Sequence, residues 1–166
     1  MKLRVILMLL AVVLLCSSLP GQEAAFAKDP AISPDGNEVC FVYDGDLWIV
    51  SFKGGIARRL TQTKAHEWAP LWSPDGKWIA FNSNREGRTY AYLIPSTGGE
   101  SRVIFRETYS VVDWFNDSQN LLVTGYNYEF GRSMYKLPIS GERPTLVADI
   151  RDVWASLSPD NKQIVF

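Results

Sequence analysis

Short apolar runs recur along the chain at a nearly constant spacing. Each run contains three residues and begins three positions after the end of a polar turn sequence. The four runs are Val39-Cys40-Phe41, Ile79-Ala80-Phe81, Leu121-Leu122-Val123 and Ile164-Val165-Phe166. Continuous apolar runs of this length, bounded by turn residues, are typical of strands that are buried on both faces. The pattern therefore predicts a β-protein in which one strand recurs at the same place in each repeat.

The turn before each run is nearly the same sequence every time. Ser-Pro-Asp-Gly occupies 33–36 and 73–76, Ser-Pro-Asp-Asn occupies 158–161, and Asn-Asp-Ser at 116–118 replaces it in the third copy. Proline presets φ, aspartate bonds the backbone ahead of it, and glycine or asparagine accepts the left-handed conformation that follows. We interpret the copies as structural turns. Their defining residues are Pro34, Asp35, Gly36, Pro74, Asp75, Gly76, Asp117, Pro159, Asp160 and Asn161.

The repeat has the length of a propeller blade. The turn aspartates are 40, 42 and 43 residues apart, and a second, glycine-containing turn follows each of the first three. Each unit therefore reads as strand, turn, strand, variable loop, strand, glycine turn, strand, which is a four-stranded antiparallel blade. The predicted fold is an all-β, incomplete β-propeller with three full blades and the first two strands of a fourth. The blades are expected at about 29–61, 68–105, 110–148 and, in part, 153–166.

The N-terminus has a different pattern. Lys2 and Arg4 precede an unbroken apolar run at 5–15, and Ala-Phe-Ala follows at 25–27. A basic start, a short apolar core and a small-residue cleavage site predict a signal peptide over 1–27. The propeller would then occupy 28–166, with no stable membrane insertion after cleavage. The expected location is outside the cytoplasm, in the periplasm or the extracellular space.

Composition supports a folded, exported domain. The chain of 166 residues is 46% hydrophobic and 21% charged, and its net charge of −1 includes no long run of one sign, which argues against a nucleic-acid partner. Cleavage would leave Cys40 as the single cysteine, so no internal disulfide is expected, and its place in an apolar run predicts a buried side chain. A lipid anchor on Cys16 is a less favoured alternative, because Leu15 is bulky where lipoprotein processing requires a small residue.

Candidate chemistry is sparse. His66 is the single histidine, and the chain has no Gly-x-Ser-x-Gly motif, so no catalytic residue is assigned. Loops before first strands commonly face a propeller's channel, which makes His66, Glu67 and Trp68 the candidate substrate-contact residues. Each turn aspartate belongs to its own turn, and Asp44-Gly45-Asp46 lacks the further ligands of a calcium loop. Neither a metal nor a cofactor is therefore expected.

Two segments carry a resemblance to known propellers. "DPAISPDGNEVCFVYDGDLWIVSFKGGIARRLT" and "HEWAPLWSPDGKWIAFNSNREG" resemble the repeats of tricorn-like proteases, TolB-like proteins and prolyl-oligopeptidase-type peptidases. The resemblance covers 29–166. The opening blade, placed directly after the signal sequence, is most similar to the N-terminal β-propeller of an exported bacterial tricorn-like serine protease.

This resemblance implies two alternative functions. In the first, the chain is the leading part of a serine peptidase, and its propeller binds or admits peptides for a catalytic region after Phe166. In the second, it belongs to a non-enzymatic TolB-like propeller that binds proteins or an envelope polymer. In both, the expected partners are peptides or proteins. The exposed faces of an unclosed ring would also favour homo-oligomers.

Overall fold

A computed structural model of the chain describes residues 26–107, 109–127, 131–149 and 155–166. All regular structure in these residues is β-strand. In the described part of the chain there is accordingly no helix long and apolar enough to cross a membrane. The expected signal peptide falls almost wholly outside the described residues and stays a prediction.

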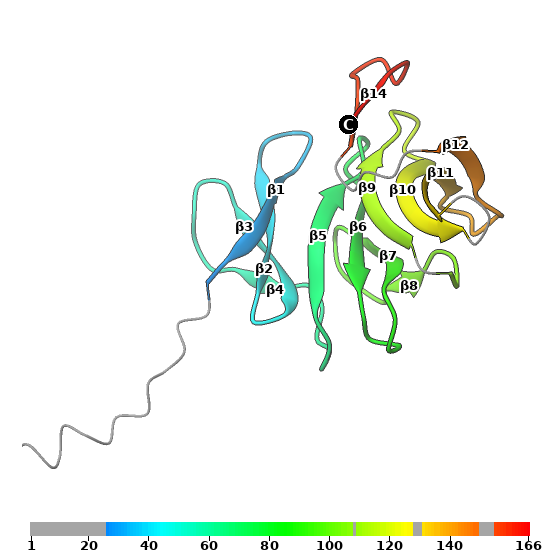
Figure 1. The fold of residues 1–166 in the computed structure, drawn as a ribbon. Helices are drawn as coiled ribbons and strands as arrows, with labels where there is room; N and C mark the ends of the chain where they lie inside the picture. The colour runs from blue at the N-terminus through cyan, green and yellow to red at the C-terminus, as the bar shows by residue number, and fades with distance from the viewer. Residues whose placement is uncertain (1–25, 108, 128–130, 150–154) are drawn as a thin grey trace, which may run out of the picture.

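The strands form four antiparallel sheets, each made of consecutive strands (Figure 1). The first sheet contains β1 (Lys28–Ile32), β2 (Glu38–Tyr43), β3 (Asp46–Ser51) and β4 (Arg58–Arg59). The second contains β5 (Glu67–Trp72), β6 (Trp78–Ser83), β7 (Tyr90–Pro95) and β8 (Arg102–Val103). The third contains β9 (Tyr109–Trp114), β10 (Asn120–Asn127), β11 (Gly131–Pro138) and β12 (Thr145–Ala148). The last pairs β13 (Ser156–Leu157) with β14 (Ile164–Val165).

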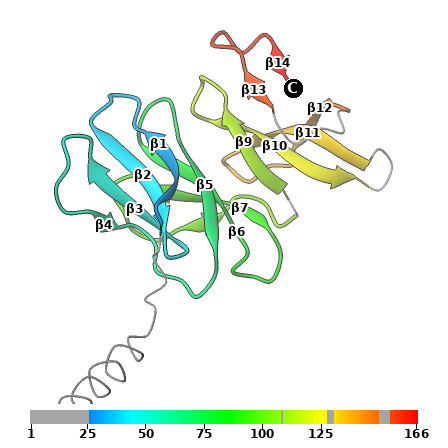
Figure 2. The same ribbon diagram turned by 60° about the vertical axis from the view of Figure 1, so that its left-hand side comes forward.

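The sheets are arranged as successive blades that do not close into a ring (Figures 1 and 2). The predicted fold class, an incomplete propeller of four-stranded antiparallel blades, is confirmed. Strand pairing within each blade follows chain order, so every connection inside a blade is a short hairpin. This order is the one that a meandering four-stranded blade requires.

The hydrophobic core lies between the sheets. One cluster, which includes Cys40 and Phe81, joins the first and second sheets, and another, which includes Ala80 and Val123, joins the second and third. Successive residues of a strand point to opposite faces. Phe81 therefore packs on the first sheet, whereas its neighbour Ala80 packs toward the third. Burial on both faces explains why the central strands carry unbroken apolar runs.

The repeated turns and the variable loops lie at opposite ends of the strands, and therefore at opposite edges of each blade. The β1–β2 and β5–β6 turns lie at one edge, the turn edge. The β2–β3 and β6–β7 loops, together with the β4–β5 linker, lie at the other, the loop edge (Figure 2). Antiparallel alternation imposes this division. It separates the repeated turn sequences from the variable loops.

The turns at the turn edge are held by their own side chains. The Ser33 hydroxyl donates to Asp35 Oδ1 at 2.6 Å and accepts the Glu38 backbone N–H at 2.9 Å. Ser73 and Asp75 repeat the first of these bonds at 2.7 Å. Gly36 has φ of +73°, in the left-handed region, where glycine is free of Cβ strain. In the two turns whose sequence departs from Ser-Pro-Asp-Gly, Ser118 and Asn161 occupy the same left-handed region, with φ of 55° and 56°.

Candidate functional site

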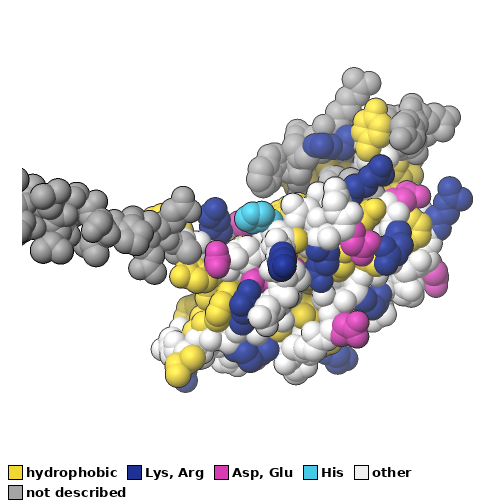
Figure 3. Space-filling view, turned by 90° about the horizontal axis from the view of Figure 1, so that it is seen from below, with side chains coloured by type: hydrophobic (Ala, Val, Ile, Leu, Met, Phe, Trp, Pro, Cys, Tyr) yellow, Lys and Arg dark blue, Asp and Glu magenta, His cyan; other side chains and the backbone are white. Residues whose placement is uncertain are grey.

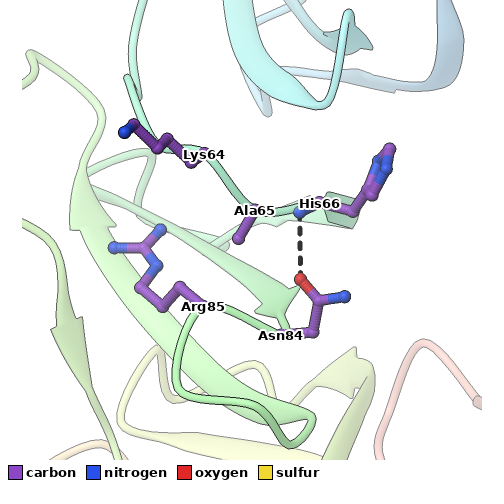
Figure 4. Close-up of a pocket in the computed structure, with 5 residues that line it drawn as sticks. All are labelled: Lys64, Ala65, His66, Asn84 and Arg85. Carbon is purple, nitrogen blue, oxygen red and sulfur yellow. Dashed lines mark hydrogen bonds between the residues drawn. The ribbon is translucent and has the colours of Figure 1, made fainter.

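A cavity opens at the loop edge between the β4–β5 linker and the β6–β7 loop. Its volume is about 370 Å³, and it is lined by Lys64, Ala65, His66, Asn84 and Arg85 (Figure 4). Figure 3 shows the face of the molecule on which the His66 side chain is exposed, with Lys and Arg side chains distributed over it. This volume is at the lower end of the range for small-ligand sites. The cavity contains one of the three residues expected to contact a ligand.

His66 is fixed by both neighbouring sheets. Its backbone N–H donates to Asn84 Oδ1 at 3.0 Å, which ties the linker to the β6–β7 loop. Its imidazole packs on the β2–β3 turn of the first sheet, next to Gly45. A Cβ added to Gly45 would lie 3.4 Å from His66 Nδ1 and 3.2 Å from the Ala65 carbonyl oxygen. Gly45 also has φ of +79°. Both the backbone conformation and the space beside His66 therefore favour glycine there.

Glu67 is buried rather than exposed at the cavity surface. It begins β5, and its backbone N–H donates to the Gly45 carbonyl oxygen at 2.9 Å. Its carboxylate Oε1 accepts from Arg85 Nη2 and, at 3.3 Å, from the Thr63 hydroxyl, whereas Oε2 has no hydrogen-bond partner among the described residues. Burial raises the pKa of Glu67 and favours its neutral form. Glu67 thus lies beneath the surface of the cavity and supports Arg85 there.

Arg85 was not singled out by the sequence, yet it is the most firmly held side chain of the cavity. Its Nε donates to Ser83 Oγ at 3.0 Å and its Nη1 to Ser101 Oγ at 2.6 Å. Its Cζ lies 4.3 Å from the centre of the Tyr92 ring, a cation–π distance. Arg85 comes from a variable loop that has no repeated sequence, so no periodic signal marks it. Only the position of that loop beside the β4–β5 linker indicates its role.

Trp68 lies beside the cavity but does not line it. It is a half-buried residue of β5 that pairs with Asn82 of β6. The strand register shifts after it, and Ala69 has φ of +49° and donates its N–H to Asp29 Oδ2 of the first sheet at 3.0 Å. The bulge therefore attaches this end of β5 to the preceding sheet.

A second buried carboxylate, Asp46, lies at the same junction. It forms an ion pair with Arg59 and accepts the Thr63 backbone N–H at 3.0 Å. Asp46 and Glu67 are thus held near the linker by different arginines. Among the described residues no group of three or more His, Cys, Asp or Glu could hold a metal ion. The two carboxylates stabilise the linker, and each contact described for them is with another group of the protein.

Two other features lie away from this cavity. Cys40 is fully buried, and burial raises the pKa of its thiol to about 12, so the reactive thiolate is strongly disfavoured. A second cavity, of about 460 Å³, lies at the turn edge between the first two Ser-Pro-Asp-Gly turns and includes Trp72. The aspartates that line it, Asp35 and Asp75, are each engaged within their own turn.

A family profile matches most of the chain. The profile described as the tricorn protease N-terminal beta propeller domain matches residues 24–166. A Bacillus subtilis protein named as the uncharacterized peptidase YuxL is 33% identical over 109 residues, which cover 58% of this chain and 17% of that protein. A tricorn protease homolog of Streptomyces coelicolor is 41% identical over 81 residues, which cover 48% of this chain and 7% of that protein. This chain therefore spans a small part of the length of both relatives.

Among solved structures, the chain is also similar to a TolB-type propeller. The structure of a protein named as a TolB of Agrobacterium tumefaciens superposes with a TM-score of 0.72 at 25% sequence identity. The match covers 84% of this chain and 53% of that one.

Proposed function

This chain belongs to the family of tricorn protease N-terminal β-propeller domains, and we propose that it binds peptides for the catalytic region of a larger, exported serine peptidase. In this proposal the propeller holds or admits the substrate, and bond cleavage occurs elsewhere in the protein. This separation of substrate binding from bond cleavage fits the described residues. The hydrogen bonds of His66 among the described residues are made by its backbone, to Asn84, and Cys40 is buried in the core.

The observation that supports this proposal most is the cavity at the loop edge. It combines an exposed histidine with two cationic side chains, Lys64 and Arg85, on the face where variable loops meet. Variable loops on a rigid β-scaffold are where binding residues usually lie. We place the peptide contacts at 64–68, with His66 exposed, Trp68 half-buried beside the cavity and Glu67 supporting Arg85 from below.

The proposal is tested first by asking whether the full-length protein cleaves peptides. We expect hydrolysis of unstructured peptides of several lengths, followed by mass spectrometry, and inhibition by a reagent that modifies active-site serines. Peptide binding without any cleavage would contradict the peptidase part of the proposal.

The likeness to TolB favours a second candidate, a non-enzymatic propeller that binds a protein or an envelope polymer. It predicts no cleavage under any of these conditions. It also predicts that the protein is recovered in a stable complex from the cell envelope. Cleavage that a serine-directed reagent abolishes would exclude this candidate.

A further inference from the structure

The second half of the β4–β5 linker, the segment 63–66, is held in place by side chains. The Thr63 N–H donates to Asp46 Oδ1 at 3.0 Å, and the Ala65 N–H donates to the Thr63 hydroxyl at 3.3 Å. The His66 N–H donates to Asn84 Oδ1 at 3.0 Å (Figure 4). Strand amides bond the backbone of a neighbouring strand instead. The segment 63–66 can therefore detach while the sheets on both sides persist.

One end of this segment is attached to the buried carboxyl group of Glu67. The Thr63 hydroxyl donates to Glu67 Oε1 at 3.3 Å. The Glu67 side chain has no exposed surface, and its Oε2 has no hydrogen-bond partner among the described residues. A carboxylate divides its charge between both oxygens, so ionisation would leave part of a charge buried without a hydrogen bond. The site therefore fits a neutral carboxyl better than a carboxylate.

The charged groups around Glu67 do not remove this cost. Arg85, from the β6–β7 loop, contacts Oε1 and favours the carboxylate. Asp46 of β3 opposes it with a negative charge and is itself paired with Arg59 of β4. Burial outweighs the attraction of Arg85, and the pKa of Glu67 is raised above its ordinary value of 4.5. The closed site thus holds a proton that a solvated site would release.

We propose that Glu67 is a proton-dependent latch, which keeps the segment 63–66 closed while its carboxyl is protonated and lets the segment open when the proton leaves. Opening admits water to the carboxyl group, and the proton passes from the carboxyl oxygen to solvent. Lys64, Ala65 and His66 line one side of the cavity at the loop edge, so the opening removes that wall. The inference concerns the cavity itself and does not depend on the nature of its ligand.

Proton linkage fixes the direction of the effect. In the open form Glu67 ionises with its ordinary pKa of 4.5, and in the closed form it ionises at higher pH. Between these two values, each pH unit raises the ratio of open to closed segment by up to about tenfold, because opening releases one proton. Below 4.5 the ratio is constant, and above the pKa of the closed form it levels off.

Hydrogen exchange of the full-length protein, followed by mass spectrometry between about pH 4 and pH 8, measures this opening. Exchange rates are converted to protection factors, which removes the intrinsic effect of pH. We expect the protection of 63–66 to fall by up to about tenfold per pH unit above 4.5 and then to level off. Glu67→Gln should give a flat profile. The control Glu100→Gln, an exposed position of the second sheet, should keep the profile of the parent.

Urea distinguishes this local opening from unfolding of the whole propeller. A local opening exposes little surface, so low urea concentrations should leave the protection of 63–66 unchanged and reduce that of β6. Thr63→Val tests the latch without altering Glu67. It removes the hydroxyl bond and should lower the protection of the segment about two- to tenfold at every pH, with the pH dependence retained.

Three results would overturn the inference. The first is a flat pH profile for 63–66 in the parent protein. The second is a pH dependence that persists unchanged in Glu67→Gln. The third is a segment 63–66 that is as protected and as sensitive to urea as β6, since exchange would then require unfolding of the whole domain. None of these results bears on whether the propeller binds peptides.

Discussion

The indole N–H of Trp114 donates to the carbonyl oxygen of Leu71 in the preceding sheet, at a distance of 3.0 Å. The same bond occurs one blade earlier, where Trp72 donates to Ala31 at 3.1 Å. Both tryptophans stand one residue before the repeated turn. They attach the first strand of one blade to the first strand of the blade before it, so the repeat encodes contacts between blades as well as the turns within them.

Replacement of Trp114 by phenylalanine should destabilise the protein by about 1–3 kcal/mol. The substitution removes the indole donor and leaves the Leu71 carbonyl oxygen without its partner at a largely buried site. The free energy of unfolding from urea titration is the measurement. Trp48→Phe is the control, because Trp48 is half-exposed and bonds the Tyr43 carbonyl oxygen of its own sheet. Equal losses in the two variants would contradict a special role for the bond between blades.

Gly125→Ala should be destabilising by about 1–3 kcal/mol, for a steric reason. Gly125 pairs with Tyr109 across β10 and β9, and a Cβ at this position would lie 2.1 Å from Tyr109 Cε1. The backbone of Gly125 needs no positive φ, so the clash with the ring is the main cost. Replacing Tyr109 by a smaller residue should then relieve the Gly125→Ala defect in a double-mutant cycle. Strictly additive losses would show that the clash is not the cause.

The blade architecture could be read from the sequence because it is periodic. The regular spacing of the turn aspartates and the apolar triplets predicted strands buried on both faces. The fold confirms this for Ile79-Ala80-Phe81 and Leu121-Leu122-Val123, whereas Val165 and Phe166 of the last triplet are exposed. Such positions recur because every inner blade meets the same packing problem on both sides. The same packing requirement in each inner blade therefore favours the same residue types at the same positions of the repeat.

The cavity could be predicted only in part, because it depends on segments that do not repeat. His66 stood out as the single histidine. Arg85, however, lies in a loop whose length and composition vary between blades, and its bonds to Ser83 and Ser101 join different segments of its sheet. Likewise, the burial of Glu67 follows from the position of the first blade's β2–β3 turn beside it. Contacts of this kind arise from the packing of one particular pair of blades.

Glu67 should make stability depend on pH in the range above its ordinary pKa. Its pKa is raised in the folded protein because of burial. The carboxyl is neutral in both states below the unfolded pKa, and stability is lost as pH rises from there through the folded pKa. Glu67→Gln should therefore gain stability relative to the parent as pH increases. The comparison uses urea titrations across that range, with the exposed Glu100→Gln as control. A constant difference between parent and Glu67→Gln at every pH would refute this prediction.

Asp35 should produce the opposite pH dependence. The Ser33 hydroxyl and the Asn37 backbone N–H donate to its carboxylate and lower its pKa to about 2. A lowered pKa stabilises the fold above the unfolded value of 3.8, and this contribution is lost as pH falls toward 2. In thermal melts, the parent should therefore lose more stability on acidification than Asp35→Asn does. Identical acid profiles for the two proteins would show that the turn bonds contribute nothing measurable.

The central claim, that this propeller supplies peptide contacts to a peptidase, is tested most directly by a ratio of specificity constants. The paired substitution His66→Ala/Trp68→Ala is made in the full-length protein, and kcat/KM is measured for a long peptide and for a very short substrate. If 64–68 forms part of the binding surface, the long-to-short ratio should fall about tenfold, mainly through KM, because a long substrate loses contacts that a short one never makes. A ratio equal to that of the parent in a correctly folded variant would contradict the account, and so would a collapse of kcat for the short substrate.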